Sequence, residues 1–384
     1  MNKYLIALKE LKVNNELILK MLKIFQLIDF KLLFEGKYLD IEFKHNIKFD
    51  KYANTFSDVP KLNDAIKKAK EIIALSKENK IKITNIKDKK YPYNLKLIDN
   101  PPAILYYKGR AFYKKHRKSI ACVGTRSITS FGINASEAII PSLVKEGFTI
   151  ISGLAIGIDT VSHKICLDNG GTAIAVLAHG LDAIYPKSNK DLYNRILENN
   201  GLVVSEYPIG TKPDKFRFVE RNRLVSGLSK GTIVFETKEK SGTMHTVNYT
   251  LEQDKPVFCP LPQEAGLTTT ALIKLIQQGK AISIPSQNAF ERVVLGTGYK
   301  IKDKDKVNKL KKKSASNIIN SSKIDYKELD KAFNFDEKKY SGIRVDKDLY
   351  LKYREVLKEN NLTNKEMFNA FMLSVINSNS SNKK

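Results

Sequence analysis

The stretch Ser119-Ile-Ala-Cys-Val-Gly-Thr-Arg-Ser127 decides the fold. Its apolar, β-prone residues run up to Gly124, and an arginine stands two residues beyond that glycine. A second apolar run, Thr149-Ile-Ile-Ser-Gly-Leu-Ala-Ile-Gly-Ile-Asp159, ends in a Gly-x-x-x-Gly turn that opens a helical pattern. Glycines let backbone N–H groups approach a phosphate closely, and the N-terminus of a following helix adds a partial positive charge. The two runs predict adjacent strand-to-helix turns of one α/β sheet, with an anion site where the strands end.

Between residues 119 and 284 the pattern of strand, turn and helix repeats. Continuous apolar strands such as Thr232-Ile-Val-Phe-Glu236 are typical of a sheet that helices cover on both faces. The expected fold class is therefore α/β, a Rossmann-like, doubly wound and mainly parallel sheet. The expected strands are 119–123, 148–151, 172–177, 202–205, 232–236, 256–259 and 281–284, and the expected helices between them are 131–146, 155–168, 189–199, 242–253 and 268–278.

The regions that flank this pattern differ from it in composition. Residues 1–85 have helical periodicity and predict a small N-terminal helical domain, and 86–290 form the core with an extended lead-in. Residues 291–339 are rich in Lys, Asn and Ser and predict a basic, flexible linker. Residues 340–384 have a strand-helix-helix order, which resembles a small ribbon-helix-helix subunit; a helical tail that only dimerises is the alternative interpretation.

The charge of the chain favours a polyanionic partner. Its 384 residues carry 66 Lys and Arg against 41 Asp and Glu, a formal net charge of +25. A field of this sign attracts nucleic acid, although a lysine-rich proteome alone would also produce a lysine-rich surface. The charge therefore predicts a class of partner and does not by itself identify one.

The start of the chain and its cysteines predict a cytoplasmic protein with no membrane partner. Cys122, Cys166 and Cys259 lie far apart, without a C-x-x-C spacing, and are interpreted as reduced core residues. Charged residues interrupt the first ten positions too early for a signal peptide, and no apolar run is long enough to cross a bilayer.

Cations and turn residues follow several of the expected strands, where open α/β sheets bind ligands. Four or five cations around one groove suit a run of phosphates better than a single nucleotide, and arginine adds a fixed fork for phosphate. The candidate phosphate-binding residues are Gly124, Thr125 and Arg126 in the first turn, Ser152, Gly153 and Gly157 in the second, and Lys187, Arg221 and Arg223 on loops after later strands.

Each candidate also has a purely structural interpretation. Gly124 would serve only the tight turn, Arg126 would pair with Asp159 or Glu236, and one of the later arginines would be structural. Aromatic residues interleave with the charges and would either stack on unpaired bases or pack in the core; they are Tyr185, Tyr207, Phe216 and Phe218.

Residues 91–284 resemble the DNA-processing protein A family, known as DprA or Smf. The motifs that carry the resemblance are Leu105-Tyr-Tyr-Lys-Gly109, Val123-Gly-Thr-Arg126, Ser152-Gly-Leu-Ala-Ile-Gly-Ile-Asp159, Gly180-Leu-Asp-Ala-Ile-Tyr-Pro-Lys187, Ser205-Glu-Tyr-Pro208, Arg221-Asn-Arg223 and Ser241-Gly-Thr243. The resemblance implies a core that binds single-stranded DNA, forms a homodimer, protects incoming DNA and loads the recombinase RecA in natural transformation. It also adds Ser241, Gly242 and Thr243 to the expected DNA site.

Three features depart from the family pattern. After Cys259-Pro260 the usual Pro-Gly ending is replaced by Leu261-Pro-Gln-Glu-Ala-Gly266. Ile156 stands where the family usually has an arginine, which removes one expected phosphate contact or internal ion pair. The tail after residue 340 does not resemble the winged helix that often ends these proteins.

We expect a binding protein without catalytic residues, metal or cofactor, because no Walker lysine, Gly-x-Ser-x-Gly or H-E-x-x-H motif is present. Two other interpretations stay open. Ser241-Gly-Thr243 with Glu252 is a partial match to the nucleotide turn of phosphoribohydrolases of the lysine decarboxylase-like type. Alternatively, the tail reads DNA and the chain is a regulator.

Overall fold

The computed structural model describes residues 1–262, 266–286 and 288–301. Met1–Lys300 form one compact unit. The predicted tail at 340–384 and residues 302–339 of the predicted linker lie outside the described residues. The start of the predicted linker is part of a helix, Ala289–Gly296. The expected boundaries of the domains remain predictions.

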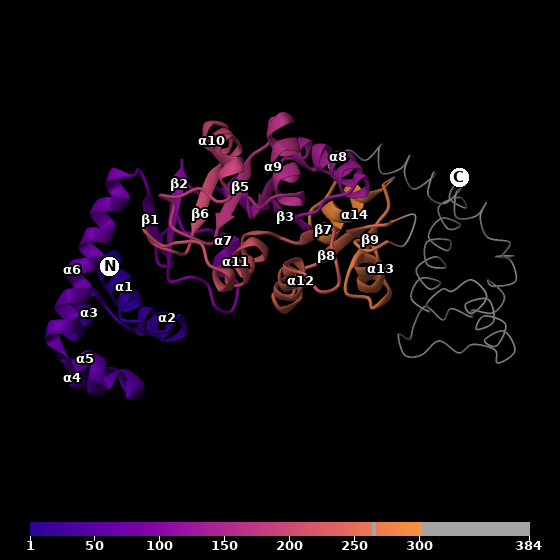
Figure 1. The fold of residues 1–384 in the computed structure, drawn as a ribbon. Helices are drawn as coiled ribbons and strands as arrows, with labels where there is room; N and C mark the ends of the chain where they lie inside the picture. Colours follow the sequence, from indigo (N-terminus) through magenta and orange to yellow (C-terminus); the bar gives the residue numbers. More distant parts are fainter. Residues whose placement is uncertain (263–265, 287, 302–384) are drawn as a thin grey trace, which may run out of the picture. The chain divides into compact units, whose positions relative to one another are not determined.

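One sheet of nine strands, in the order β1-β2-β6-β5-β4-β3-β7-β8-β9, runs through the described part of the chain (Figure 1). The strands from β3 to β9 pair in parallel, whereas β2 pairs antiparallel with both β1 and β6. The bounds are β1 Lys82–Asn85, β2 Ile104–Gly109, β3 Ser119–Gly124, β4 Thr149–Ser152, β5 Ala173–Leu177, β6 Leu202–Ser205, β7 Thr232–Glu236, β8 Val257–Pro260 and β9 Ile282–Ile284.

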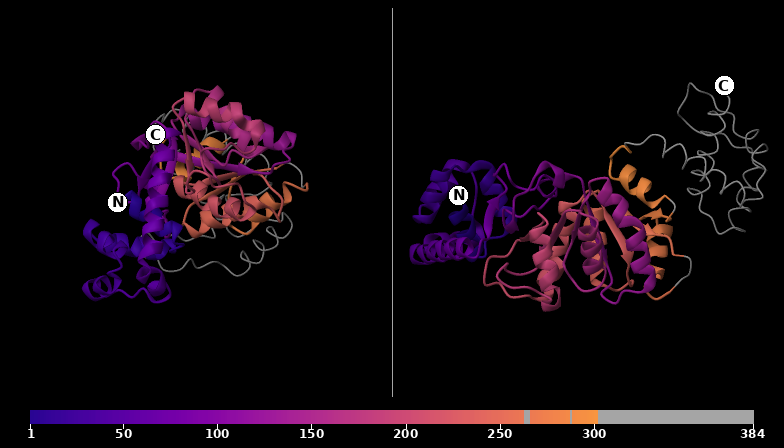
Figure 2. Two further views of the ribbon diagram at one scale, coloured as in Figure 1. Left: turned by 60° about the vertical axis from the view of Figure 1, so that its left-hand side comes forward. Right: turned by 90° about the horizontal axis from the view of Figure 1, so that it is seen from above.

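Helices cover both faces of this sheet, as the apolar strands predict. In Figure 1 and in the left view of Figure 2, α8, α9 and α10 lie on one face, and α11, α12 and α13 lie on the other. The bounds are α7 Tyr93–Lys96, α8 Ser130–Lys145, α9 Ile158–Asp168, α10 Lys190–Glu198, α11 Lys215–Leu228, α12 Gly242–Glu252, α13 Thr270–Gln277 and α14 Ala289–Gly296, with short 3-10 turns at Lys114–Arg117 and Lys187–Asn189. The Rossmann-like, doubly wound fold is confirmed.

The N-terminal helices precede the sheet and pack around their own apolar residues, which include the fully buried Leu5, Ile18, Met21 and Phe30. Their bounds are α1 Asn2–Glu10, α2 Asn15–Ile24, α3 Leu27–Phe34, α4 Tyr38–His45, a 3-10 turn at Asp50–Tyr52, α5 Ala53–Ser57 and α6 Val59–Glu78. The segment after α6 then joins the sheet as β1.

The expected strands agree with the observed strands to within one residue at each end. Strands β1 and β2 and helices α7, α11 and α14 were not among the expected elements. Of these, α11 occupies residues that were expected to be loop, and it carries Arg221 and Arg223. Polar and apolar residues are mixed around this helix, so its sequence shows little amphipathic periodicity. Among the described residues, no helix is long and apolar enough to cross a membrane.

Candidate nucleic-acid interface

A pocket of about 560 Å³ opens where β3, β4 and β7 end, between α11 and α12. It brings together the predicted residues Gly124, Thr125, Arg126, Gly153, Arg221, Ser241, Gly242 and Thr243. It also includes Tyr185, Lys215, Phe218, Asn222 and Lys238, of which only the two aromatics had been singled out in the sequence. The predicted residues Ser152, Gly157, Lys187 and Arg223 do not line it.

The first turn is held by close contacts within the fold. A Cβ atom at Gly124 would lie 2.4 Å from Cγ1 of Ile158 and 2.7 Å from the carbonyl oxygen of Glu236, so only glycine fits there. The backbone N–H of Thr125 donates to that same carbonyl at 2.7 Å. This amide is therefore engaged within the protein, which corrects the expectation that Thr125 offers its N–H to a phosphate.

The second turn is likewise an internal scaffold. The buried Ser152 hydroxyl donates to the carbonyl oxygen of Cys122 at 2.6 Å, and the N–H of Gly153 donates to the carboxylate of Asp159 at 3.0 Å. Gly157 has φ of +88°, and a Cβ there would lie 2.2 Å from the carbonyl oxygen of Thr125. Ser152 and Gly157 thus act on the site indirectly, because they fix the turn that carries Arg126.

Arg221 is a buried cation between the two turns. Its side chain donates from Nη1 to the carbonyl oxygens of Gly153 and Val176, and the residue is only 5% exposed. A Cβ at Gly153 would lie 2.5 Å from this guanidinium, so the glycine makes room for the arginine. Burial lowers the pKa of Arg221 to about 10, and the nearby Asp159 opposes that shift. Burial also raises the pKa of Asp159, and Arg221 is the largest influence that opposes it.

Three other cations of the pocket are exposed: Arg126, Lys215 and Lys238. None of them makes a side-chain hydrogen bond or an ion pair with any described residue. Arg126 therefore pairs neither with Asp159 nor with Glu236, the two carboxylates that its structural interpretation required. In addition, α12 begins at Gly242, so the positive end of its dipole lies at the pocket.

An aromatic platform lies among these charges. The guanidinium carbons of Arg126 and Arg221 are each 5.9 Å from the centroid of the Phe218 ring. The ring of Tyr185, whose exposed fraction is 46%, lies 5.6 Å from the same centroid. Flat rings beside unpaired cations are the combination that unpaired bases and their phosphates contact in proteins that bind single strands.

Comparison with known proteins places this chain. The model of the family described as DNA recombination-mediator protein A matches residues 82–293. The chain belongs to this family. Among curated relatives, protein Smf of Synechocystis is 44% identical over 205 residues, which are 52% of this chain and 51% of the relative. DNA processing protein DprA of Bacillus subtilis is 37% identical over 226 residues, 59% of this chain and 76% of the relative. The match therefore spans about half the length of the Synechocystis relative.

Two solved structures of DprA proteins are similar to this DprA-family chain. The X-ray structure of DNA processing protein A from Streptococcus pneumoniae has a TM-score of 0.62 and 30% identity, covering 78% of this chain and 99% of that one. A structure of the protein from Helicobacter pylori, described for its single-stranded DNA binding mode, has a TM-score of 0.50 and 28% identity. The match covers 56% of this chain and 96% of the Helicobacter pylori chain. The resemblance seen in the sequence motifs is confirmed.

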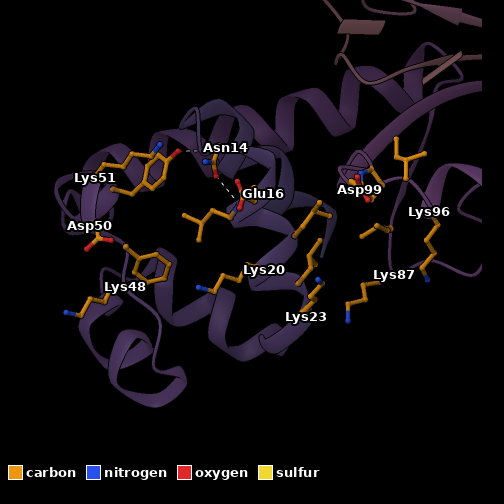
Figure 3. Close-up of a pocket in the computed structure, with 18 residues that line it drawn as sticks. Asn14, Glu16, Lys20, Lys23, Lys48, Asp50, Lys51, Lys87, Lys96 and Asp99 are labelled. Atoms are coloured by element: carbon orange, nitrogen blue, oxygen red, sulfur yellow. Dashed lines mark hydrogen bonds between the residues drawn. The ribbon is translucent and has the colours of Figure 1, made fainter. Parts of the chain in front are cut away.

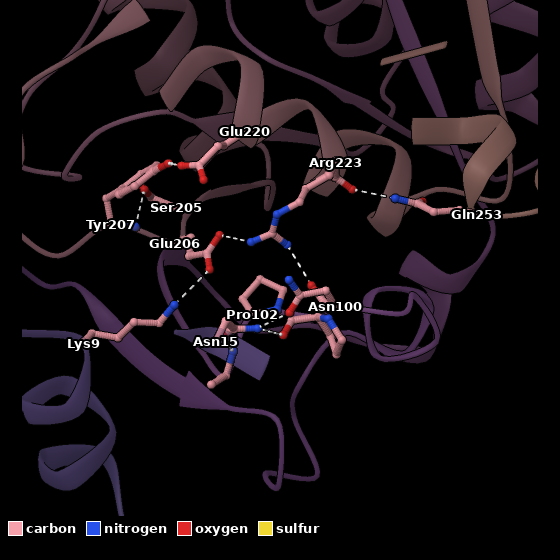
Figure 4. A network of polar contacts seen from close by, with 12 residues as sticks. Lys9, Asn15, Asn100, Pro102, Ser205, Glu206, Tyr207, Glu220, Arg223 and Gln253 are labelled. Atoms are coloured by element: carbon pink, nitrogen blue, oxygen red, sulfur yellow. Dashed lines mark hydrogen bonds and ion pairs between the residues drawn. The ribbon is translucent and has the colours of Figure 1, made fainter. Parts of the chain in front are cut away.

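Two predicted cations lie outside the pocket of this DprA-family protein. Arg223 donates to the carbonyl oxygen of Asn100 at 3.0 Å and forms an ion pair with Glu206, which also pairs with Lys9 at 3.6 Å (Figure 4). It therefore ties α11 to the lead-in of the core. Lys187 is exposed at the start of a 3-10 turn.

Two further residues singled out in the sequence lie outside the pocket. Ile156, at the position of the usual family arginine, is 53% exposed and does not line the pocket. Glu252, the carboxylate of the hydrolase interpretation, is exposed at the C-terminal end of α12 and is likewise not part of the pocket. Lys215 was missed because α11, at whose first residue it stands, was not predicted.

Proposed function

We propose that this chain binds single-stranded DNA in the pocket between α11 and α12 as a recombination mediator. The observation that carries the proposal is a set of exposed cations without ion-pair partners among the described residues, in the pocket that also holds the neighbouring rings of Phe218 and Tyr185. In duplex DNA the flat faces of the bases are stacked on their neighbours and cannot contact a protein ring. A single strand offers both its phosphates and the flat faces of its bases to such a site. The description of the Helicobacter pylori relative supports this choice of ligand.

The proposal is tested by titrating the full chain with single- and double-stranded oligonucleotides at several salt concentrations. We expect tighter binding of the single strand and little preference among sequences, because backbone contacts carry no sequence information. Equal affinity for duplex and single strand would count against this pocket as the site.

Replacing Arg126 with alanine is expected to weaken binding and to lower the slope of log affinity against log salt by about 0.7, the value of one phosphate contact on a single strand. The thermal midpoint is expected to stay the same, because the side chain is exposed and makes no ion pair with described residues. Fluorescence anisotropy at four or more salt concentrations measures the slope. An unchanged slope in a folded variant would remove Arg126 from the site.

Two lysines distinguish the site expected from the sequence from the site seen in the structure. Lys187 was a candidate from the sequence, whereas Lys215 was not. Both are exposed lysines, but only Lys215 lines the pocket. We expect Lys215→Ala to lower the salt slope by about 0.7 and Lys187→Ala to lower it less. The opposite order would move the DNA path away from α11 and toward the turn after Pro186.

The proposed binding of single-stranded DNA also suggests what the chain does with the bound strand. We propose that the bound strand is protected and passed to a RecA-type recombinase, and that the chain acts as a homodimer in the cytoplasm. The family description, a recombination mediator, supports the transfer step. The Arg126→Ala variant tests it as well: the wild-type chain is expected to shorten the lag of recombinase filament formation on single-stranded DNA, and the variant is not. Light scattering of the full chain gives the mass that tests the dimer.

A further inference from the structure

A second hollow, of about 840 Å³, lies where the N-terminal helices meet the lead-in of the core (Figure 3). Its walls come from three separate segments: α2, the turn around residues 48–52, and residues 86–101. We call it the lysine groove, because six lysines line it: Lys20, Lys23, Lys48, Lys51, Lys87 and Lys96.

The amino groups of the groove lysines are not neutralised by described carboxylates, although that of Lys51 lies 5.2 Å from the centroid of the Tyr52 ring. All six are exposed, and none makes an ion pair or a side-chain hydrogen bond with another described residue. The carboxylates that also line the groove are Glu16, Asp50 and Asp99, so positive charges outnumber negative ones. In the view of Figure 3 the amino groups of Lys20, Lys23 and Lys87 follow one another along one side, and Glu16 and Asp99 lie apart from that row.

Hydrogen bonds fix the walls of the groove relative to each other. The side chain of Asn15, the first residue of α2, donates to Oδ1 of Asn100 at 2.5 Å and to the carbonyl oxygen of Pro101 at 2.8 Å, and it accepts from the N–H of Ala103 at 3.1 Å. The network in Figure 4 adds the ion pairs of Glu206 with Lys9 and Arg223. The groove is therefore preorganised, which lowers the entropic cost of binding.

Helix α11 connects the groove with the DNA pocket. Arg221 lies in the pocket, and Arg223, two residues later, bonds to the carbonyl oxygen of Asn100 beside the groove wall. Residues two apart on a helix are about 200° apart around its axis, so Arg221 and Arg223 lie on different sides of α11.

We propose that the lysine groove binds the phosphodiester backbone of the same single strand that occupies the pocket, which lengthens the DNA site across α11. The inference rests on the proposed function. The lysines come from three segments and are spread along a large hollow. This arrangement suits a chain of phosphates that is bound without base recognition. A single compact anion would instead need donors that converge on one point.

The test compares two triple variants of the full chain with equal loss of charge. Lys20→Gln, Lys23→Gln and Lys87→Gln neutralise the groove, and Lys67→Gln, Lys68→Gln and Lys70→Gln neutralise exposed lysines of α6 that line neither hollow. Each variant is titrated with oligothymidylates from about 5 to about 30 nucleotides, a range that starts near the size of one small binding site.

We expect the groove variant to bind the shortest strands as the wild type does and the longest strands roughly tenfold to a hundredfold more weakly at 0.1 M salt, with a salt slope lower by about 2, the sum of three single-strand contacts. The α6 variant is expected to follow the wild type closely at both lengths. Equal affinities of the two variants for long strands would overturn the inference, and the groove would then belong to another partner such as an acidic protein.

The outcomes also separate this inference from the proposed function. Arg126→Ala is expected to weaken the binding of short and long strands alike, because every strand enters the pocket. If Arg126→Ala has no effect at any length, the proposed function fails. If the groove variant loses short strands as strongly as long ones while its thermal midpoint is unchanged, the groove is part of the primary site and the extension proposed here is wrong.

Discussion

Replacement of Arg221 by methionine is expected to lower the free energy of unfolding by about 3–5 kcal/mol, the usual result when one partner of a buried charge pair is removed. The guanidinium is 5% exposed and holds the carbonyl oxygens of Gly153 and Val176. Without it, the buried carboxylate of Asp159 loses the cation that does most to lower its pKa. Chemical denaturation of the full chain measures the loss.

The pH dependence of that loss identifies its cause. The pKa of Asp159 is already raised in the folded state, and removal of Arg221 raises it further. Because the pKa of Asp159 is raised in the folded state, the folded chain binds a proton at this carboxyl more readily than the unfolded chain does. The stability deficit of the variant therefore grows as the pH rises from the folded pKa of the wild type toward the higher folded pKa of the variant, and it is smaller below that range. Arg217→Met on the same helix is the matched control; that side chain makes a hydrogen bond to the carbonyl oxygen of Lys212, and we expect a loss of about 1 kcal/mol or less. A deficit that does not depend on pH would assign the effect to packing.

Replacement of Gly157 by alanine is expected to lower the free energy of unfolding by about 2–5 kcal/mol and to weaken DNA binding. A positive φ costs an L-residue about 1–2 kcal/mol, and forced contacts in a packed region typically cost a further 1–3 kcal/mol. Here a new Cβ would lie 2.2 Å from the carbonyl oxygen of Thr125 and 2.7 Å from Cα of Arg126. The backbone that carries Arg126 must therefore move.

Gly147→Ala is the comparison variant, because this glycine also has a positive φ but lacks such contacts. Gly147 follows α8 with φ of +84°, but a Cβ there meets no atom within 4 Å. Its replacement should cost only the conformational penalty of about 1–2 kcal/mol and leave DNA binding unchanged. Equal losses in the two variants would mean that the turn relaxes around the new methyl group, and the binding of single-stranded DNA would then be retained in both.

The parallel part of the sheet could be predicted closely from sequence because its strands are short apolar runs with segments long enough for a helix between most of them. Helix α11 could not, because it packs against other elements on several sides and its residues follow no simple period. This one omission placed Arg221 and Arg223 on loops and left Lys215 unnoticed.

The phosphate-binding candidates were harder to judge than the fold. Sequence shows that an arginine is near a turn, but its burial depends on neighbours that are distant along the chain. Gly153 leaves space for one guanidinium, which is why Arg221 is buried while Arg126 is exposed and unpaired among described residues. Similarly, the ion pair of Arg223 depends on Glu206, which follows a different strand.

Glu206 links two parts of the chain that lie far apart in the sequence. This one carboxylate neutralises Lys9 of α1 and Arg223 of α11. Loss of this carboxylate would therefore leave the side chains of Lys9 and Arg223 without their ion-pair partner at the same time, one on α1 and the other on α11.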